Sequence, residues 1–183
     1  MNLTDIKIKT GPNPGGTVRL WLVPWQDVLL IPNPDPATGI ITESIYLKEN
    51  KRWYKFQFAP NRCKLSNPSA GQEGSSYYNT LLEVSVPGSD QVQLMIFESM
   101  INGLFLALVD QADGVIKLAG TVQAPLLCSQ VGYDAGGDNQ DFHGTSFQFR
   151  SRGFMSRQYT GFIQDVATAW RVKESSAYCI KEY

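Results

Sequence analysis

Short apolar stretches separated by proline, glycine and asparagine are the feature that most constrains the fold of this chain. In the first half these breaks recur at intervals too short for helices, and prolines are concentrated before residue 40. Each proline fixes its own φ and restricts the residue before it, so a helix cannot run through such a segment. The pattern is typical of strands joined by turns. We therefore expect a mostly β fold, either a β-sandwich or a barrel.

Size and composition favour one globular domain over residues 1–183. The chain is short enough for a single core, and 43% hydrophobic with 18% charged residues argue against a disordered chain. Sixteen basic against seventeen acidic residues give a formal net charge of −1, which offers no broad attraction to nucleic acid or an anionic membrane. The N-terminus lacks the apolar core of a secretory signal, and no apolar run is long enough to span a bilayer. We expect a protein that folds in the cytoplasm and binds no membrane.

Alternation of apolar and polar residues with a period of two predicts the positions of the strands. The stretches with this pattern or a related strand pattern are residues 5–10, 17–23, 40–47, 53–58, 77–86, 115–122 and 142–151. Residues 104–110 are apolar without alternation, which indicates a strand buried on both faces. The Asp113-Gly114 pair after them is typical of a hairpin turn. Towards the C-terminus, residues 168–173 and 177–181 fit strands, while residues 162–169 fit a short helix.

Residues 40–47 and 53–58 are expected to pair as a hairpin around residues 48–51. Alternation in the second of these strands places Tyr54, Phe56 and Phe58 on the core face. Trp53 then falls on the opposite face, where it becomes a candidate for an exposed aromatic side chain.

Residues 90–102 form the helix that the sequence predicts with most support. Ser89 is a suitable N-cap, and Asn102-Gly103 supplies a left-handed stop. Val92, Met95, Ile96, Ser99 and Met100 follow one stripe, but further apolar residues make this helix apolar nearly all round. Two of its faces must therefore be covered, one of them by a neighbouring subunit.

Residues 59–76 are rich in asparagine, serine, glycine and proline, and we expect an extended loop. A structureless segment of this length is uncommon in a compact domain unless it is disordered or functional. We favour a function through contact with another chain.

Few residues in the sequence suggest catalysis. His143 is the one histidine, which excludes paired imidazoles and sites with two histidine ligands, and we expect it to be partly buried and hydrogen-bonded. Cys63, Cys128 and Cys179 lie far apart and are interpreted as buried, reduced thiols. We expect no catalytic residue, no metal and no cofactor. A calcium site is left open as the alternative to an ordinary acidic loop at four oxygen-bearing residues, Asp134, Asp138, Asn139 and Asp141.

The aromatic residues leave one other function open. Tryptophan and tyrosine side chains stack on sugar rings in β-sandwich modules, although most aromatic residues of a β protein fill its core. Trp53 and Tyr77 are the candidates for exposed positions. The alternative function is therefore a monomeric glycan-binding β-sandwich module.

The order of elements between residues 77 and 154 carries a resemblance to a known family. A strand ending in Val86-Pro87-Gly88 is followed by an apolar helix, a buried strand, an Asp-Gly turn, Leu118-Ala-Gly120, Ala124-Pro125-Leu126, a Gly/Asp loop and a Phe-x-Phe strand. This order resembles structural tail and neck proteins of bacteriophages that infect Bacteroidetes-type bacteria and, more loosely, the tail-tube fold. The clear resemblance covers less than half of the chain, and residues 31–39 extend it weakly. It implies a tail-tube-like β-sandwich or barrel with one flanking helix at about residues 90–102.

The resemblance also implies a function in the virion. Such proteins form homo-oligomeric rings around the channel through which the genomic DNA passes without sequence-specific contact, and extended loops join stacked rings. We expect assembly in the cytoplasm of the bacterial host, in the tail or neck, with tube, connector and baseplate positions left open. The candidate interface residues lie on the helix and in the loop: Val92, Leu94, Phe97, Ile101, Cys63, Lys64, Leu65 and Gln72.

Overall fold

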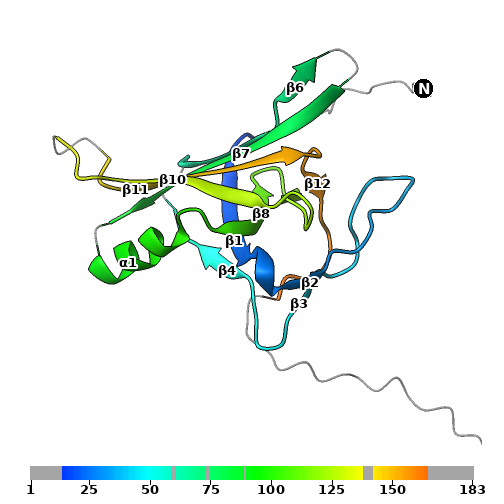
Figure 1. The fold of residues 1–183 in the computed structure, drawn as a ribbon, viewed down its shortest axis with the longest axis horizontal. Helices are drawn as coiled ribbons and strands as arrows, with labels where there is room; N and C mark the ends of the chain where they lie inside the picture. The colour runs from blue at the N-terminus through cyan, green and yellow to red at the C-terminus, as the bar shows by residue number, and fades with distance from the viewer. Residues whose placement is uncertain (1–13, 59–60, 73–74, 89, 138–141, 165–183) are drawn as a thin grey trace, which may run out of the picture.

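A computed structural model describes residues 14–58, 61–72, 75–88, 90–137 and 142–164 (Figure 1). They form a mostly β structure with one flanking α-helix, so the predicted fold class is confirmed. The elements in chain order are β1 (Thr17–Pro24), a 3-10 turn (Trp25–Asp27), β2 (Val28–Leu30), β3 (Tyr46–Leu47), β4 (Tyr54–Phe56), β5 (Cys63–Ser66), β6 (Ser69–Gln72), β7 (Ser75–Pro87), α1 (Gln91–Met100), β8 (Leu104–Gln111), β9 (Ile116–Ala119), β10 (Leu126–Asp134), β11 (Gly144–Gly153) and β12 (Arg157–Gln158).

The main sheet folds into two layers. One layer contains β4, β1, β8, β9 and β12, and the other contains β10, β11 and β7 with β5 and β6 along its edge. The two layers are joined where β10 pairs with β8, through Leu126 opposite Phe105 and Leu127 opposite Leu104. Figure 1 shows β7, β10 and β11 running across the direction of β1.

The β1–β8 layer has an apolar core on each face. Leu20 and Leu22 of β1 point into the first core, towards β7 and β11, whereas Trp21 and Val23 point into the second. Residues of the 41–53 segment and Tyr159 cover the second core. Strands buried on both faces need apolar residues at successive positions. This explains the apolar run of β8 and confirms its predicted burial.

The predicted hairpin of residues 40–47 and 53–58 is wrong. β3 pairs with β2, and β4 pairs with β1. The predicted core face of β4 is also wrong in part, because Trp53 is 1% exposed in the second core and Tyr54 is 42% exposed. Alternation marks an outer face only where one face of a strand meets solvent, and this segment lies beside cores on two sides.

The extended loop predicted at residues 59–76 contains two strands. β5 and β6 both pair antiparallel with β7. Much of this polar segment is therefore part of the β-sheet and is not a loop. The predictions at residues 5–10, 168–173 and 177–181 lie outside the described residues. Residues 162–164 are in neither a helix nor a strand, and the rest of the helix proposed at 162–169 is also outside.

Candidate assembly surfaces

Helix α1 covers an open side of the first core. Its buried face carries Phe97 and Met100, with Leu94 half-buried against the same cluster. The Phe97 ring meets the Phe147 ring edge-on with 4.8 Å between centroids and lies 6.3 Å from that of Phe56. The assignment of Phe97 to a subunit interface is therefore corrected, because its side chain is buried in the core of its own chain. Leu94 remains partly exposed, so its predicted interface role stays a prediction.

The ends of α1 agree in part with the sequence. Asp90 is the N-cap, with an extended backbone and no side-chain hydrogen bond to the helix, whereas the predicted cap, Ser89, lies outside the described residues. At the other end Asn102 has a φ of 61°, which is the predicted left-handed stop. The helix is thus fixed more firmly at its C-terminal end, where its buried residues also lie.

The outer face of α1 is apolar and open to solvent. Val92 is 66% exposed, Met95 63% and Ile96 55%. Together with Ser99 they follow the i, i+3, i+4, i+7 spacing of one helix face, and we call these four residues the outer stripe. Full burial of a side chain of this size stabilises a structure by about 1.5–3 kcal/mol. Because the three apolar residues of the outer stripe are more than half exposed, the isolated chain gains less than half of this free energy at each of them. Ile101, which follows the helix and was also predicted to lie in an interface, is 42% exposed.

A groove runs between α1 and β4. Ile96 and Phe56 divide it into two hollows of about 430 and 470 Å³. The first is largely apolar and is lined by Leu22, Pro24, Gln26, Tyr54, Phe56, Ile96, Ser99, Met100, Gly103, Leu104 and Phe105. The second is lined by Lys55, Phe56, Gln57, Phe58, Val86, Pro87, Gln93, Ile96 and Phe97. We call the two hollows together the α1–β4 groove.

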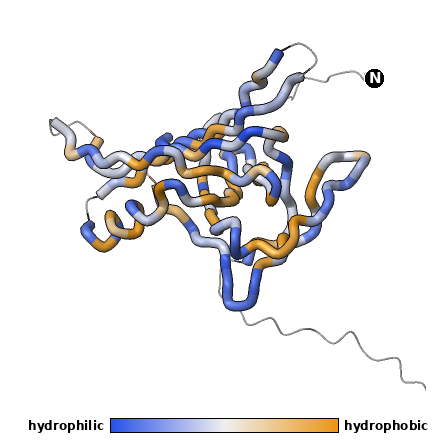
Figure 2. The backbone as a smooth tube through the Cα atoms, viewed as in Figure 1, coloured by the Kyte–Doolittle hydropathy of each residue, from blue (hydrophilic) through white to orange (hydrophobic). Residues whose placement is uncertain are grey.

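A two-stranded ribbon projects from the other side of the fold. Residues 69–72 of β6 pair with residues 75–78 of β7, and Figure 1 shows this ribbon reaching beyond the two layers. We call it the β6–β7 arm. Every described side chain on it is exposed except that of Ala70, which is half-buried. Figure 2 accordingly shows the arm mainly in the blue and white of polar residues, whereas α1 carries several hydrophobic ones.

The predicted contact residues of the 59–76 segment are separated by the fold. Gln72 lies exposed near the tip of the arm, and Lys64 is exposed on β5. Cys63 is 5% exposed in the first core, and Leu65 is half-buried against the same core. The interface assignment of Cys63 is therefore corrected, because pairing of β5 with β7 points its side chain into the first core. Leu65 points the same way but keeps part of its surface exposed, so its predicted interface role stays a prediction.

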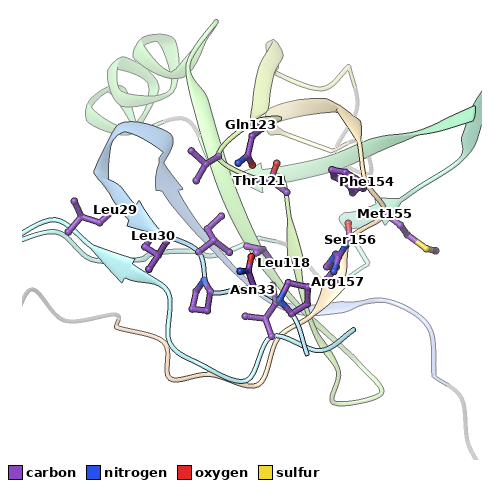
Figure 3. A pocket seen from close by; sticks show the side chains of 16 residues that line it. Leu29, Leu30, Asn33, Leu118, Thr121, Gln123, Phe154, Met155, Ser156 and Arg157 are labelled. Atoms are coloured by element: carbon purple, nitrogen blue, oxygen red, sulfur yellow. The ribbon is translucent and has the colours of Figure 1, made fainter. Parts of the chain in front are cut away.

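A second apolar patch was missed by sequence reasoning. Leu29 and Leu30 of β2 are 62% and 56% exposed, and Phe154 and Met155 are 68% and 50% exposed. They border a hollow of about 350 Å³, and Figure 3 shows the two leucines on one side of it and Phe154 with Met155 on the other. We call these four residues the β2 patch. In sequence, Val28-Leu-Leu-Ile31 has the character of a core segment, and no local signal distinguishes an exposed leucine from a buried one.

The described residues offer little for catalysis. His143 lies exposed at the end of the β10–β11 pair, not partly buried as predicted, and its Nε2 is 2.9 Å from the Tyr133 hydroxyl. Burial raises the pKa of the Cys63 and Cys128 thiols to about 11, so both are protonated at neutral pH and are weak nucleophiles. Both are unbridged and buried, as predicted, while Cys179 lies outside the described residues.

Neither a metal-binding group nor a membrane-spanning helix occurs among the described residues. Among the described residues no three histidine, cysteine, aspartate or glutamate side chains form a metal-binding group. Asp134 accepts a hydrogen bond from the Gly136 amide, while Asp138, Asn139 and Asp141 lie outside. None of the described helices combines the length and apolar character that crossing a membrane requires.

The two aromatic candidates for sugar binding have different surroundings. Trp53 is buried in the second core, which removes it from any binding surface, whereas Tyr77 is 36% exposed on the arm. Comparisons of this chain with family models, curated proteins and solved structures give no match. The function is therefore inferred from the outer stripe, the β2 patch and the β6–β7 arm.

Proposed function

We propose that this chain is a structural subunit that assembles with copies of itself into a ring of a bacteriophage tail or neck, around the DNA channel. The observation that carries the proposal is the β6–β7 arm. An isolated two-stranded ribbon is at best marginally stable in water, and the described side chains of this arm bury no core of their own. Contact with another subunit would supply the missing cover.

The two apolar surfaces favour a head-to-tail contact. The outer stripe lies on α1, whereas the β2 patch lies on β2 and the segment before β12, and these elements are on opposite sides of the fold in Figure 1. A contact between two different surfaces repeats from one subunit to the next and produces a ring or a filament. A two-fold dimer would instead use one surface twice.

The outer face of the β7–β11 layer suits the lining of a channel. Ser85 and Ser146 hydroxyls are 3.1 Å apart on it. Arg150 donates to the Gln148 side chain, which in turn donates to Glu83 at 3.2 Å. Side chains that satisfy each other in this way offer a polar surface of mixed charge, past which DNA can move without sequence-specific contact. The bacteriophage assignment itself rests on the resemblance in element order from β7 to β11.

The test is the state of assembly of the purified full chain. We expect light scattering to report a mass that rises with concentration, and electron microscopy to show closed rings. Met95→Ser, on the outer stripe, should weaken assembly, whereas Glu49→Ser, at an exposed position outside the three surfaces, should not. A monomer at every concentration would refute the proposal, and a monomer that binds glycans through Tyr77 would favour the glycan-binding module.

A further inference from the structure

The outer stripe of α1 lies beside a single charged residue. Glu98 is the only charged residue of the helix between Gln91 and Met100, and its side chain is exposed. It follows Met95 by three positions, which places the two side chains next to each other on the surface of the helix. The apolar stripe is therefore bordered by a negative charge.

The hollow beside the β2 patch carries the opposite charge. Arg157 is the only charged residue among the described side chains that line this hollow, and it is exposed. Its guanidinium carbon Cζ lies 5.9 Å from the centroid of the Phe154 ring. Figure 3 shows Arg157 on the same side of the hollow as Phe154 and Met155. The apolar β2 patch is therefore bordered by a positive charge.

Neither Glu98 nor Arg157 takes part in an ion pair within the described part of the chain. The ion pairs found there join an arginine of β1 to an aspartate of β8, and a lysine of the 41–53 segment to an aspartate of the 3-10 turn. Both charges are therefore available to a partner. Exposed ion pairs at the rim of an interface add little to affinity, but they select the partner and fix its orientation.

These charges distinguish between the possible pairings of the two surfaces. A contact of stripe against stripe would join two acidic surfaces, because neither α1 nor its N-cap Asp90 supplies a basic residue. A contact of patch against patch would bring only the positive charge of Arg157 from each side. A contact of stripe against patch places opposite charges together and also joins the two apolar surfaces. The charges therefore favour a contact between unlike surfaces.

The hollow has the size to receive side chains of one helix face. Its volume of about 350 Å³ lies within the range of about 300–1,000 Å³ that is typical of pockets for drug-sized ligands. It can therefore receive apolar side chains of the outer stripe, although not the whole helix, which is about 10–12 Å across. A helix that places side chains at i, i+3 and i+4 spacing into an apolar groove is a recurrent mode of recognition.

We propose that α1 of one subunit places its outer stripe in the hollow beside the β2 patch of the next subunit, with Glu98 facing Arg157 across the contact. The occupant of the hollow is thus a second copy of this chain. This inference rests on the proposed assembly and specifies the surfaces, the orientation and the charge pair that join its subunits.

Exchange of the two charges tests the orientation of the contact in the full chain. Glu98→Arg and Arg157→Glu should each place like charges at the contact and weaken assembly by about tenfold in light scattering. The double variant should regain assembly, because it restores the pair with its signs exchanged. An equimolar mixture of the two single variants should also assemble, with unlike chains alternating. Failure of both the double variant and the mixture to recover would overturn the proposal.

Disulfide trapping between two chains tests which surfaces meet. In the full chain with Cys179→Ser, one preparation carries Ser99→Cys and a second carries Met155→Cys. After mixing and mild oxidation we expect a mixed dimer several-fold more abundant than either symmetric dimer, identified by mass spectrometry of the linked peptides. Glu49→Cys, at an exposed position outside both surfaces, replaces Met155→Cys in the matched control. The native cysteines of the described residues are buried and do not compete.

The results separate this inference from the proposed assembly. Symmetric dimers in excess, or a mixed dimer no more abundant than in the control, would overturn the inference. Wild-type rings that neither single charge change affects would also overturn it, while the proposed assembly would stand. A wild-type chain that is monomeric at every concentration would refute both. Circular dichroism verifies that each variant is folded.

Discussion

The two faces of α1 allow a stability effect to be separated from an assembly effect. Phe97 is 9% exposed and contacts two aromatic rings. An aromatic side chain buries about 150–250 Å², which at about 25 cal/mol per Å² gives an upper bound of roughly 4–6 kcal/mol. Measured losses for Phe→Ala in cores are about 3–5 kcal/mol. Because α1 lies at the edge of the core and can relax, we expect Phe97→Ala to cost about 3 kcal/mol.

Met95→Ser is the matched change on the outer stripe. Its side chain is 63% exposed, so its removal should change the unfolding free energy of the monomer by less than about 0.5 kcal/mol, as for other surface positions. Urea unfolding followed by circular dichroism, at a concentration where light scattering reports monomers, measures both changes. At higher concentration Met95→Ser should lose assembly. A cost below about 1 kcal/mol for Phe97→Ala, or an equal cost for the two variants, would refute the division of this helix into a core face and an assembly face.

Three further changes test other parts of the structure. Burial raises the pKa of Cys63 and Cys128 from 9.0 to about 11. Between these two pH values the folded state keeps thiol protons that the unfolded chain releases, so the free energy of unfolding should be unaffected below about pH 9 and fall as the pH rises through 11. The loss should be up to roughly 2–3 kcal/mol per thiol. Urea unfolding across that range measures this effect, and a chain with both cysteines changed to alanine should lose most of it. Gly71→Ala places a Cβ 2.1 Å from the Ser75 carbonyl oxygen at a φ of 113°, so it should distort the arm and impair assembly while leaving monomer unfolding almost unchanged; normal rings would show that the arm is dispensable. Trp53→Ala should cost about 3–5 kcal/mol in urea unfolding, as for other buried tryptophans, and a loss near zero would contradict its place in the second core.

Sequence reasoning located the elements whose signals are local. The period-two pattern gave β1, β7 and β11, the apolar run gave β8, and Asn102 with Gly103 gave the end of α1. In each case the signal is carried by residues adjacent in the chain, where backbone preference and side-chain alternation act together.

The remaining features depend on which segments meet in space. Trp53 and Phe97 were assigned to surfaces because a sequence pattern shows that a face is apolar without showing what covers it. Residues 126–134 form β10, but its last residues were assigned to the Gly/Asp loop because they are glycine and polar residues. β5 and β6 lie in a polar segment, and only their pairing with the long β7 makes them strands. The exposed β2 patch could not be predicted for the same reason. Leu29 and Leu30 differ from core leucines only in the residues that surround them in space.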